Sequence, residues 1–150
     1  MPEYIEISLN GASVRAVLLE DQAPQSVAAV RDALPIESPA IHCMCSGECV
    51  WLLDDRVPLV EEENAFTYMS QGDICIGYKH EIVIVYGRRC ATRGRKGYMH
   101  FNVFAMVRDL DAMDRFAKEC EPIMSMGSGI IQIRSVVRDA ELETPVGTTA

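Results

Sequence analysis

The sequence lacks the long apolar runs, the surplus of basic residues and the leader-like start that mark several protein classes. Its longest uncharged run, Pro122–Ile133, contains Pro, Ser and Gly and falls short of the roughly 20 apolar residues that cross a bilayer. Lys and Arg total 14 against 22 Asp and Glu, and a net charge of −8 argues against a general nucleic-acid binder. The first residues show neither a basic start nor an apolar segment, so we expect no secretory signal and a cytoplasmic location. We therefore expect no nucleic-acid partner and no membrane partner.

The composition is that of one folded domain. The chain has 150 residues, of which 49% are hydrophobic and 24% charged, which excludes a disordered chain. No internal repeat or low-complexity tract is visible. Only the last residues, 141–150, carry Thr, Pro and Gly without apolar periodicity. We expect a single domain over residues 1–140 followed by a flexible C-terminal tail over 141–150.

Most of the chain carries strand signals. Tyr4–Leu9 alternates between apolar and polar residues, Asn10-Gly11 is a turn dipeptide, and Ser13–Leu19 follows, which predicts a hairpin. The region Ala40–Leu53, with Gly47 in its middle, predicts two strands or one bent strand. Four later runs also predict strands: Ile74–Ile76, Glu81–Tyr86 ending at Gly87, Asn102–Val107 and Ile130–Val137.

Two segments have helical spacing. Asp21–Leu34 has Pro24 near its start, and Leu110–Cys120 places its apolar residues on one face, with Asp109 or Asp111 near its start. The strands do not alternate with helices as they do in a parallel sheet. This order favours a mainly all-β protein, a closed antiparallel β-barrel with two helices.

Several segments, in this order, resemble the cyclophilin-like fold. Ala23-Pro24-Gln25-Ser26 with Val30 and Leu34 is similar to the "AP.t..n...L" helix of cyclophilins, and the segment from His42 to Gly47 lies where they carry "HRIIPG". Asn102–Val107 followed by Leu110–Met113 resembles their "vvFGkV..GmdvvdkI". The resemblance runs from about Glu6 to about Val137 and implies the cyclophilin-like barrel.

The chain is also similar to a family of small bacterial cyclophilin-like proteins without an assigned function. The matching residues are His42, Ser46, Gly47 and Glu48, Glu63-Asn64 with Gly72–Ile74, Tyr86-Gly87, and Asn102–Ala105. One position departs from true cyclophilins, in which an arginine follows the histidine and polarises the prolyl amide. Cys43 stands there, and a thiol provides no fixed cationic donor, so the chain is not expected to be an efficient prolyl isomerase.

The cysteines near His42 allow three interpretations. His42, Cys43, Cys45 and Cys49 are metal-ligand residue types, but the spacing lacks the C-x2-C pair of a zinc knuckle, and we expect no metal. A nucleophilic Cys43 would need a nearby base, and on a strand the side chain of His42 would diverge from it. We favour Cys43 and Cys45 as small buried residues of the barrel interior.

Acid–base chemistry points to a histidine and a carboxylate. His42 and Glu63 are the candidate catalytic residues, with Glu48 and His100 as weaker candidates.

The segment Arg88–Lys96 holds five basic residues, and two flexible glycines lie within or beside it. This pattern predicts either an anion-binding lid or a solvated loop, which could also contact another subunit.

The function we predict is binding of a small molecule at the barrel mouth, with an anionic ligand as one option, and in one version hydrolysis of a small polar or cyclic amide. In that version His42 or Glu63 activates water. The predicted substrate-binding residues are Asn64, Tyr86, Arg88 and Asn102. We expect no cofactor, and we expect a homo-oligomer. Two alternatives stay open, a non-catalytic ligand-binding or assembly module and a peptidyl-prolyl cis-trans isomerase.

Overall fold

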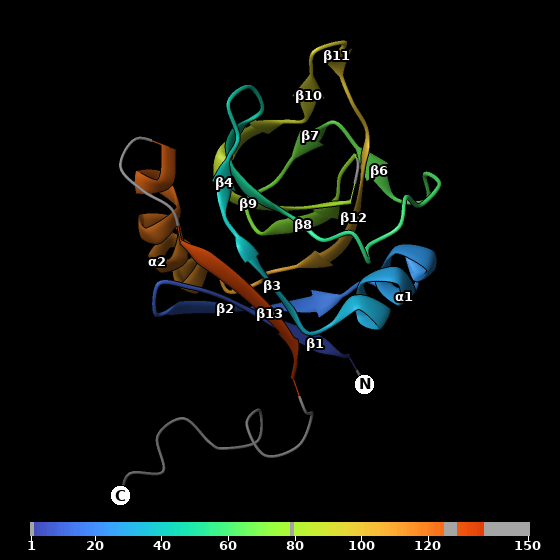
Figure 1. Cartoon of the computed structure of the whole chain (residues 1–150), viewed down its shortest axis with the longest axis horizontal. Coiled ribbons are helices and arrows are strands. Elements are labelled where there is room, and N and C mark those ends of the chain that lie inside the picture. Colours follow the sequence, from blue (N-terminus) through green and yellow to red (C-terminus); the bar gives the residue numbers. More distant parts are fainter. Residues whose placement is uncertain (1, 79, 125–128, 137–150) are drawn as a thin grey trace, which may run out of the picture.

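The protein consists of antiparallel strands and two α-helices. The computed structural model describes residues 2–78, 80–124 and 129–136 (Figure 1). The strands are β1 (Tyr4–Leu9), β2 (Ala12–Leu18), β3 (Ile36–Pro39), β4 (Ile41–His42), β5 (Gly47–Leu53), β6 (Ala65–Phe66), β7 (Tyr68–Met69), β8 (Asp73–Ile76), β9 (Glu81–Ala91), β10 (Arg93–Gly94), β11 (Gly97–Tyr98), β12 (Phe101–Met106) and β13 (Ile130–Ser135). The helices are α1 (Pro24–Ala33), α2 (Leu110–Cys120) and the 3-10 helix η1 (Glu121–Met124). The mainly β class with two α-helices is confirmed.

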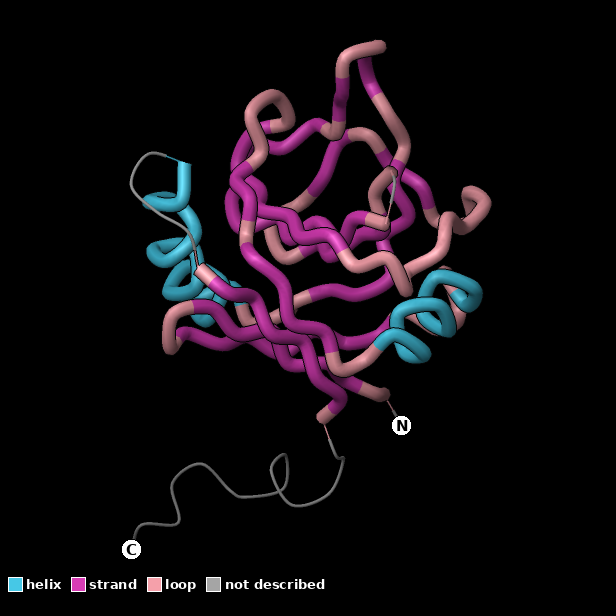
Figure 2. Tube along the Cα trace, in the orientation of Figure 1, coloured by secondary structure: helices cyan, strands magenta, loops and turns pink. Residues whose placement is uncertain are grey.

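The strands form one large sheet, and the two strands at its ends follow each other directly in the sequence. The order is β3-β13-β1-β2-β12-β8-β9-β5-β4, with β6 paired to β12 and β7 to β9, while β10 and β11 form a separate hairpin. The end strands β3 and β4 are separated only by Ala40. The Ser38 hydroxyl of β3 also donates to the carbonyl of Leu53 in β5 at 3.0 Å. In Figure 2 the strands curl around one end of the molecule, and the two helices lie on opposite sides.

The first hairpin forms as predicted because its residues satisfy both the sheet and the turn. Ile5, Ile7 and Leu9 of β1 are buried and alternate with more exposed residues. Asn10 and Gly11 both have positive φ, 50° and 85°, the conformation that a two-residue turn of this kind requires.

Both predicted helices are present, and their ends are capped. Pro24 is the first residue of α1, where its missing N–H costs nothing, and Val27 and Val30 face the core. The carboxylate of Asp109 accepts a hydrogen bond from the N–H of Ala112 at 3.0 Å and caps α2. Phe116 of α2 is fully buried. None of the described helices is long and apolar enough to cross a membrane.

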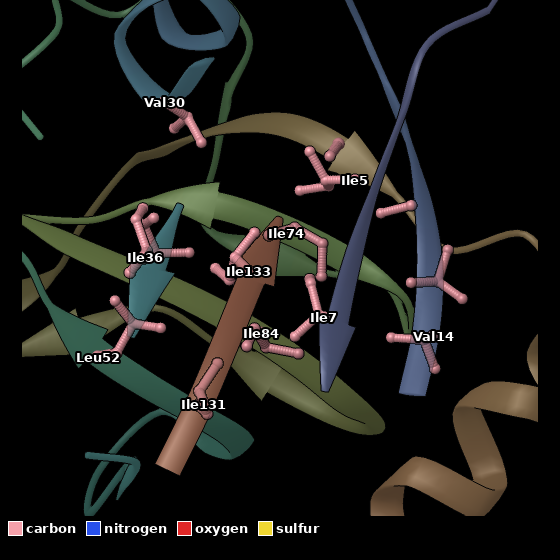
Figure 3. Packing of buried hydrophobic residues seen from close by; sticks show 14 of the residues in the cluster. Ile5, Ile7, Val14, Val30, Ile36, Leu52, Ile74, Ile84, Ile131 and Ile133 are labelled. Atoms are coloured by element: carbon pink, nitrogen blue, oxygen red, sulfur yellow. The ribbon is translucent and has the colours of Figure 1, made fainter. Parts of the chain in front are cut away.

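The buried apolar residues form two clusters, and β9 contributes to both. The larger cluster includes Ile82 and Ile84 and packs between β1, β13 and the opposite strands (Figure 3). The smaller one includes Val83 and Val85, from the other face of the same strand. Burial on both faces explains why Ile82–Tyr86 is continuously apolar instead of alternating.

Two predicted boundaries differ from the structure, and the two-strand alternative for Ala40–Leu53 is confirmed. The predicted strand Glu81–Tyr86 does not end at Gly87 but continues to Ala91, because Met69 and Tyr68 of β7 pair with its final residues. The basic segment Arg88–Lys96 is therefore not a loop throughout: it begins in β9 and continues into the β10–β11 hairpin. The region Ala40–Leu53 forms two strands, with a turn over residues 43–46. The predicted tail over 141–150 lies outside the described residues.

Candidate functional site

A pocket of about 290 Å³ opens beside the turn between β4 and β5. Its apolar wall comes from three strands or their approaches: Trp51 on β5, Val83 on β9, and Met99 with Phe101 at the start of β12. These four residues also belong to the smaller apolar cluster or pack against it. The pocket is thus a hollow at the edge of packed structure, with much of its apolar wall on strands and another part of its lining from the turn over residues 43–46.

Charges of both signs reach this wall. The pocket lining includes the guanidinium-bearing Arg93 and the carboxylate-bearing Glu81. Arg93 is anchored on the turn, because its Nε donates to the Cys45 carbonyl at 2.5 Å and its backbone N–H donates to the Ser46 hydroxyl at 3.1 Å. A ligand with an apolar body and two opposite charges would find complementary groups here.

His42 lines the same pocket and is bound to Tyr86. The His42 Nδ1 lies 2.8 Å from the carbonyl oxygen of Cys43, and its Nε2 lies 2.6 Å from the Tyr86 hydroxyl. A carbonyl only accepts, so Nδ1 carries the proton, and in the neutral ring Nε2 accepts from the Tyr86 hydroxyl. Burial raises the pKa of Tyr86 above its usual range, which keeps the phenol protonated as the donor. A ligand that uses His42 as a base must first displace Tyr86.

The turn over residues 43–46 surrounds the sulfur of Cys43 with donors. The backbone N–H of Ser46 donates to this sulfur at 3.1 Å. The Cys49 thiol also donates to the Cys43 sulfur, and this contact has the largest effect on the pKa of Cys43. The Ser46 hydroxyl and the N–H groups of Cys45 and Ser46 act in the same direction, whereas burial opposes them. Together these contacts lower the pKa of Cys43 to about 4. Hydrogen bonds with Cys43 and Cys90 raise the pKa of Cys49. These contacts favour the thiolate form of Cys43 and the thiol form of Cys49.

The prediction that Cys43 and Cys45 are buried is wrong. Cys43 is only partly buried and Cys45 is exposed, because the chain leaves the strand at this point and turns. Cys49, Cys75, Cys90 and Cys120 are buried and free. Within the described ranges, no group of three or more His, Cys, Asp or Glu side chains is arranged to hold a metal ion.

Glu63, Asn64 and Asn102 lie together, but away from His42. The Glu63 carboxylate accepts from the N–H groups of Ser26 at 2.7 Å and Gln25 at 3.2 Å, and so caps α1 in place of a side chain of the helix itself. The buried Asn102 side chain accepts from the N–H of Glu63 at 3.0 Å. Asn64 Nδ2 donates to the Val103 carbonyl at 2.8 Å. These contacts attach the 61–64 segment to β12 and α1.

Arg88, Glu48 and His100 border other hollows. Arg88 is exposed on β9 and, with Arg89, lines two surface hollows of about 490 and 510 Å³. Glu48 accepts from the N–H of Arg89 at 3.1 Å. His100 lies 3.3 Å from Glu62 at a hollow of about 350 Å³, which Asn102 also lines. The predicted site residues thus divide into a His42–Tyr86 pair, a Glu63–Asn64–Asn102 group and a separate Arg88.

A family model described as "Protein of unknown function (DUF3830)" matches residues 5–134. The chain belongs to the DUF3830 family. No curated protein matches it significantly. Among solved structures, "Structure of McbB in complex with tryptophan" is 21% identical with a TM-score of 0.72, and the match covers 94% of this chain but 48% of McbB. The chain therefore spans about half the length of McbB.

A second solved structure relates this DUF3830 chain to an archaeal protein. It is the hypothetical protein AF2241 from Archaeoglobus fulgidus, 19% identical with a TM-score of 0.59. The match covers 90% of this chain and 95% of that one. At these identities both structures establish a fold relationship and nothing about chemistry.

Sequence reasoning on this DUF3830 chain missed most of the pocket wall. Trp51, Met99 and Phe101 are apolar residues within or beside strands, and nothing in their spacing separates a pocket wall from a core. Cys43 carried a stronger signal: two thiols flank a single residue just before Ser46-Gly47, a small-residue pair that is typical of a turn. A turn there would have predicted N–H groups available to a sulfur.

Proposed function

We propose that the chain is a cyclophilin-like closed barrel that binds a small aromatic amino acid, or a close analogue, in the pocket beside the β4–β5 turn. The closed barrel is supported by the order of β3 and β4. They are the two end strands of the sheet, and they are consecutive in the sequence, so the two edges of the sheet lie on one short stretch of chain. Closure would hide the edges of the many Ile- and Val-rich strands.

The observation that carries the ligand class is the pocket wall. Trp51 and Phe101 offer aromatic faces and Met99 a polarisable sulfur, all of which favour a planar apolar group. Arg93 suits a carboxylate, and Glu81 with the Cys43 thiolate suits an ammonium group. McbB, which shares the fold, has been solved in complex with tryptophan, and tryptophan is therefore the first ligand to test.

Calorimetric titration with L-tryptophan and with tryptamine tests this proposal. Tryptamine lacks the carboxylate that Arg93 would bind. Arg93→Gln should weaken tryptophan binding about 10-fold or more, the value of a charge-assisted hydrogen bond, and leave tryptamine binding unchanged. Arg89→Gln is the matched control, because Arg89 is equally exposed in the same segment but lines other hollows.

A second pair of variants tests the location of binding. Met44 is 81% exposed and lines this pocket, whereas Leu59 is 64% exposed and lines the hollow beside His100. Met44→Ala should weaken binding, and Leu59→Ala should not. A change in the fluorescence of Trp51, the one tryptophan of the chain, when L-phenylalanine is added gives an independent signal of binding. Absence of binding by every aromatic amino acid at millimolar concentration, or equal effects of the paired variants, would refute the proposal.

Hydrolysis of a small amide is a second proposal, favoured by the position of His42 at the pocket wall. Glu63 would not share that step, because it caps α1 in a separate cluster. Turnover of cyclic and acyclic amides should be lost in His42→Ala and retained in Glu63→Gln. A variant His42→Ala with full turnover would exclude the acid–base role. The homo-oligomer stays a prediction, which native mass spectrometry tests directly.

A further inference from the structure

Two cysteines at the pocket lie opposite each other on neighbouring strands. The β4–β5 ladder pairs Ile41 with Trp51 and His42 with Val50. The backbone N–H of Cys43 donates to the carbonyl of Cys49 at 3.0 Å, which extends this ladder by one residue. Opposed residues of an antiparallel pair have Cα atoms about 4.5–5.5 Å apart, inside the roughly 4.4–6.8 Å range that a disulfide spans.

The two sulfurs already contact each other and differ in protonation. The Cys49 thiol donates a hydrogen bond to the sulfur of Cys43. Cys43 is partly exposed and lines the pocket, whereas Cys49 is 1% exposed. The pair therefore consists of an accessible thiolate with a protected thiol beside it, the arrangement of a peroxide-reactive cysteine and its resolving partner.

We propose that Cys43 is oxidised by small hydroperoxides that enter this pocket, and that Cys49 then closes a Cys43–Cys49 disulfide. In the first step the Cys43 sulfur attacks one peroxide oxygen, the S–O bond forms and the O–O bond breaks, and hydroxide or alkoxide leaves. The sulfur is oxidised by two electrons to the sulfenic acid, and the peroxide is reduced. In the second step the Cys49 sulfur attacks Cys43, the S–S bond forms, and the sulfenic hydroxyl leaves with the Cys49 proton as water.

The surroundings fit both steps. The N–H of Ser46, which faces the Cys43 sulfur, can stabilise the negative charge before the first step. After that step Cys43 no longer carries the charge, so the main cause of the raised pKa of Cys49 disappears and its thiol becomes easier to deprotonate. The reaction then stops at the disulfide instead of continuing to the sulfinic acid.

The neighbouring cysteines provide internal controls. Cys45 is more exposed than Cys43, but burial and the negative charge of Cys43 raise the pKa of Cys45, and its thiol donates to the carbonyl of Arg93 at 3.0 Å. Exposure alone would make Cys45 the oxidised residue, whereas thiolate character selects Cys43. Cys90 also contacts Cys49, so a Cys49–Cys90 bridge is the competing product.

The test is oxidation of the reduced full chain, without ligand, by one equivalent of hydrogen peroxide at pH 6. Cleavage at Met44 and after Glu48 separates Cys43, Cys45 and Cys49 onto different peptides, so the disulfide is assigned by mass spectrometry without any substitution. We expect a Cys43–Cys49 bridge that thiol reductants reverse. A bridge that contains Cys45 or Cys90, or thiol loss spread evenly over the six cysteines, would overturn the proposal.

Variants then separate the two steps. Cys43→Ser should slow peroxide-dependent thiol loss at least 10-fold, and Cys45→Ser should leave it unchanged. Cys49→Ser keeps a hydroxyl donor beside the Cys43 sulfur, so it should allow the first step and block the second, and dimedone should label a sulfenic acid at Cys43 that the parent chain does not accumulate. Equal peroxide reactivity of Cys43→Ser and Cys45→Ser, with both variants folded by circular dichroism, contradicts the proposal, as does a Cys49→Ser chain that takes up no dimedone.

Discussion

Replacement of Asn102 by alanine should destabilise the protein strongly, because this side chain holds a loop and a strand together. Its Oδ1 accepts from the N–H of Glu63 at 3.0 Å and of Asn64 at 3.4 Å, and its Nδ2 donates to the carbonyl of Glu61 at 2.9 Å. The residue is 4% exposed, so water does not readily replace these partners. At about 1 kcal/mol for each group left without a partner, the loss is about 3 kcal/mol.

Thermal unfolding followed by circular dichroism measures this effect. For a chain of this length about 3 kcal/mol corresponds to a decrease in Tm of roughly 6–12 °C. Asn64→Ala is the matched control, because the Asn64 side chain donates one hydrogen bond, to the Val103 carbonyl. It should lower Tm by about a third as much. An Asn102→Ala chain with the parent Tm but impaired ligand binding would refute this structural role and favour substrate binding by Asn102 instead.

Three further predictions concern the cysteine turn, the α1 cap and Cys43 in place of arginine. The rate of alkylation of Cys43 should hardly change between pH 6 and 8, because its lowered pKa of about 4 keeps the sulfur a thiolate throughout. The alkylation rate of an ordinary thiol rises about 75-fold over this range. Peptide mapping in which the rate at Cys43 rises as it does at Cys45 contradicts the prediction. Glu63→Gln should lower stability by about 1 kcal/mol through loss of the charge at the N-terminus of α1, measured by urea unfolding; an unchanged midpoint contradicts it. Isomerisation of a proline peptide should proceed at its uncatalysed rate, and a clear acceleration would restore the isomerase alternative.

Sequence reasoning succeeded where local pattern and tertiary environment agree. The β1–β2 hairpin was predictable because alternation and Asn10-Gly11 both specify it, and α2 because its apolar face and Asp109 cap coincide. The end of β9 was not predictable, because the pairing of Cys90 with Met69 depends on a strand of two residues. Local propensity says little about such contacts.

The site was predictable residue by residue but not as a constellation. His42 and Tyr86 were both named from the sequence, and they meet across β4 and β9. Glu63 was predicted to be catalytic because of its carboxylate. In the structure this carboxylate accepts hydrogen bonds from N–H groups at the start of α1, and Glu63 lies 37 residues from Ser26 in the sequence. Sequence periodicity does not predict such a contact, because it joins two segments that are far apart in the chain.

The chemistry proposed for the pocket depends on the short turn over residues 43–46, between β4 and β5. Gly47 has a φ of 120°, and a Cβ there would lie 2.0 Å from the carbonyl oxygen of Arg89, so only glycine allows the turn to close against β9. That closure directs the N–H of Ser46 toward the sulfur of Cys43, while the ladder holds Cys49 opposite. Cyclophilins, which the chain resembles, have an arginine at the position of Cys43 and use it for isomerisation. In this chain the turn surrounds the Cys43 sulfur with N–H donors, which stabilise an anion. Cys43 is therefore suited to nucleophilic or redox chemistry and not to polarising an amide.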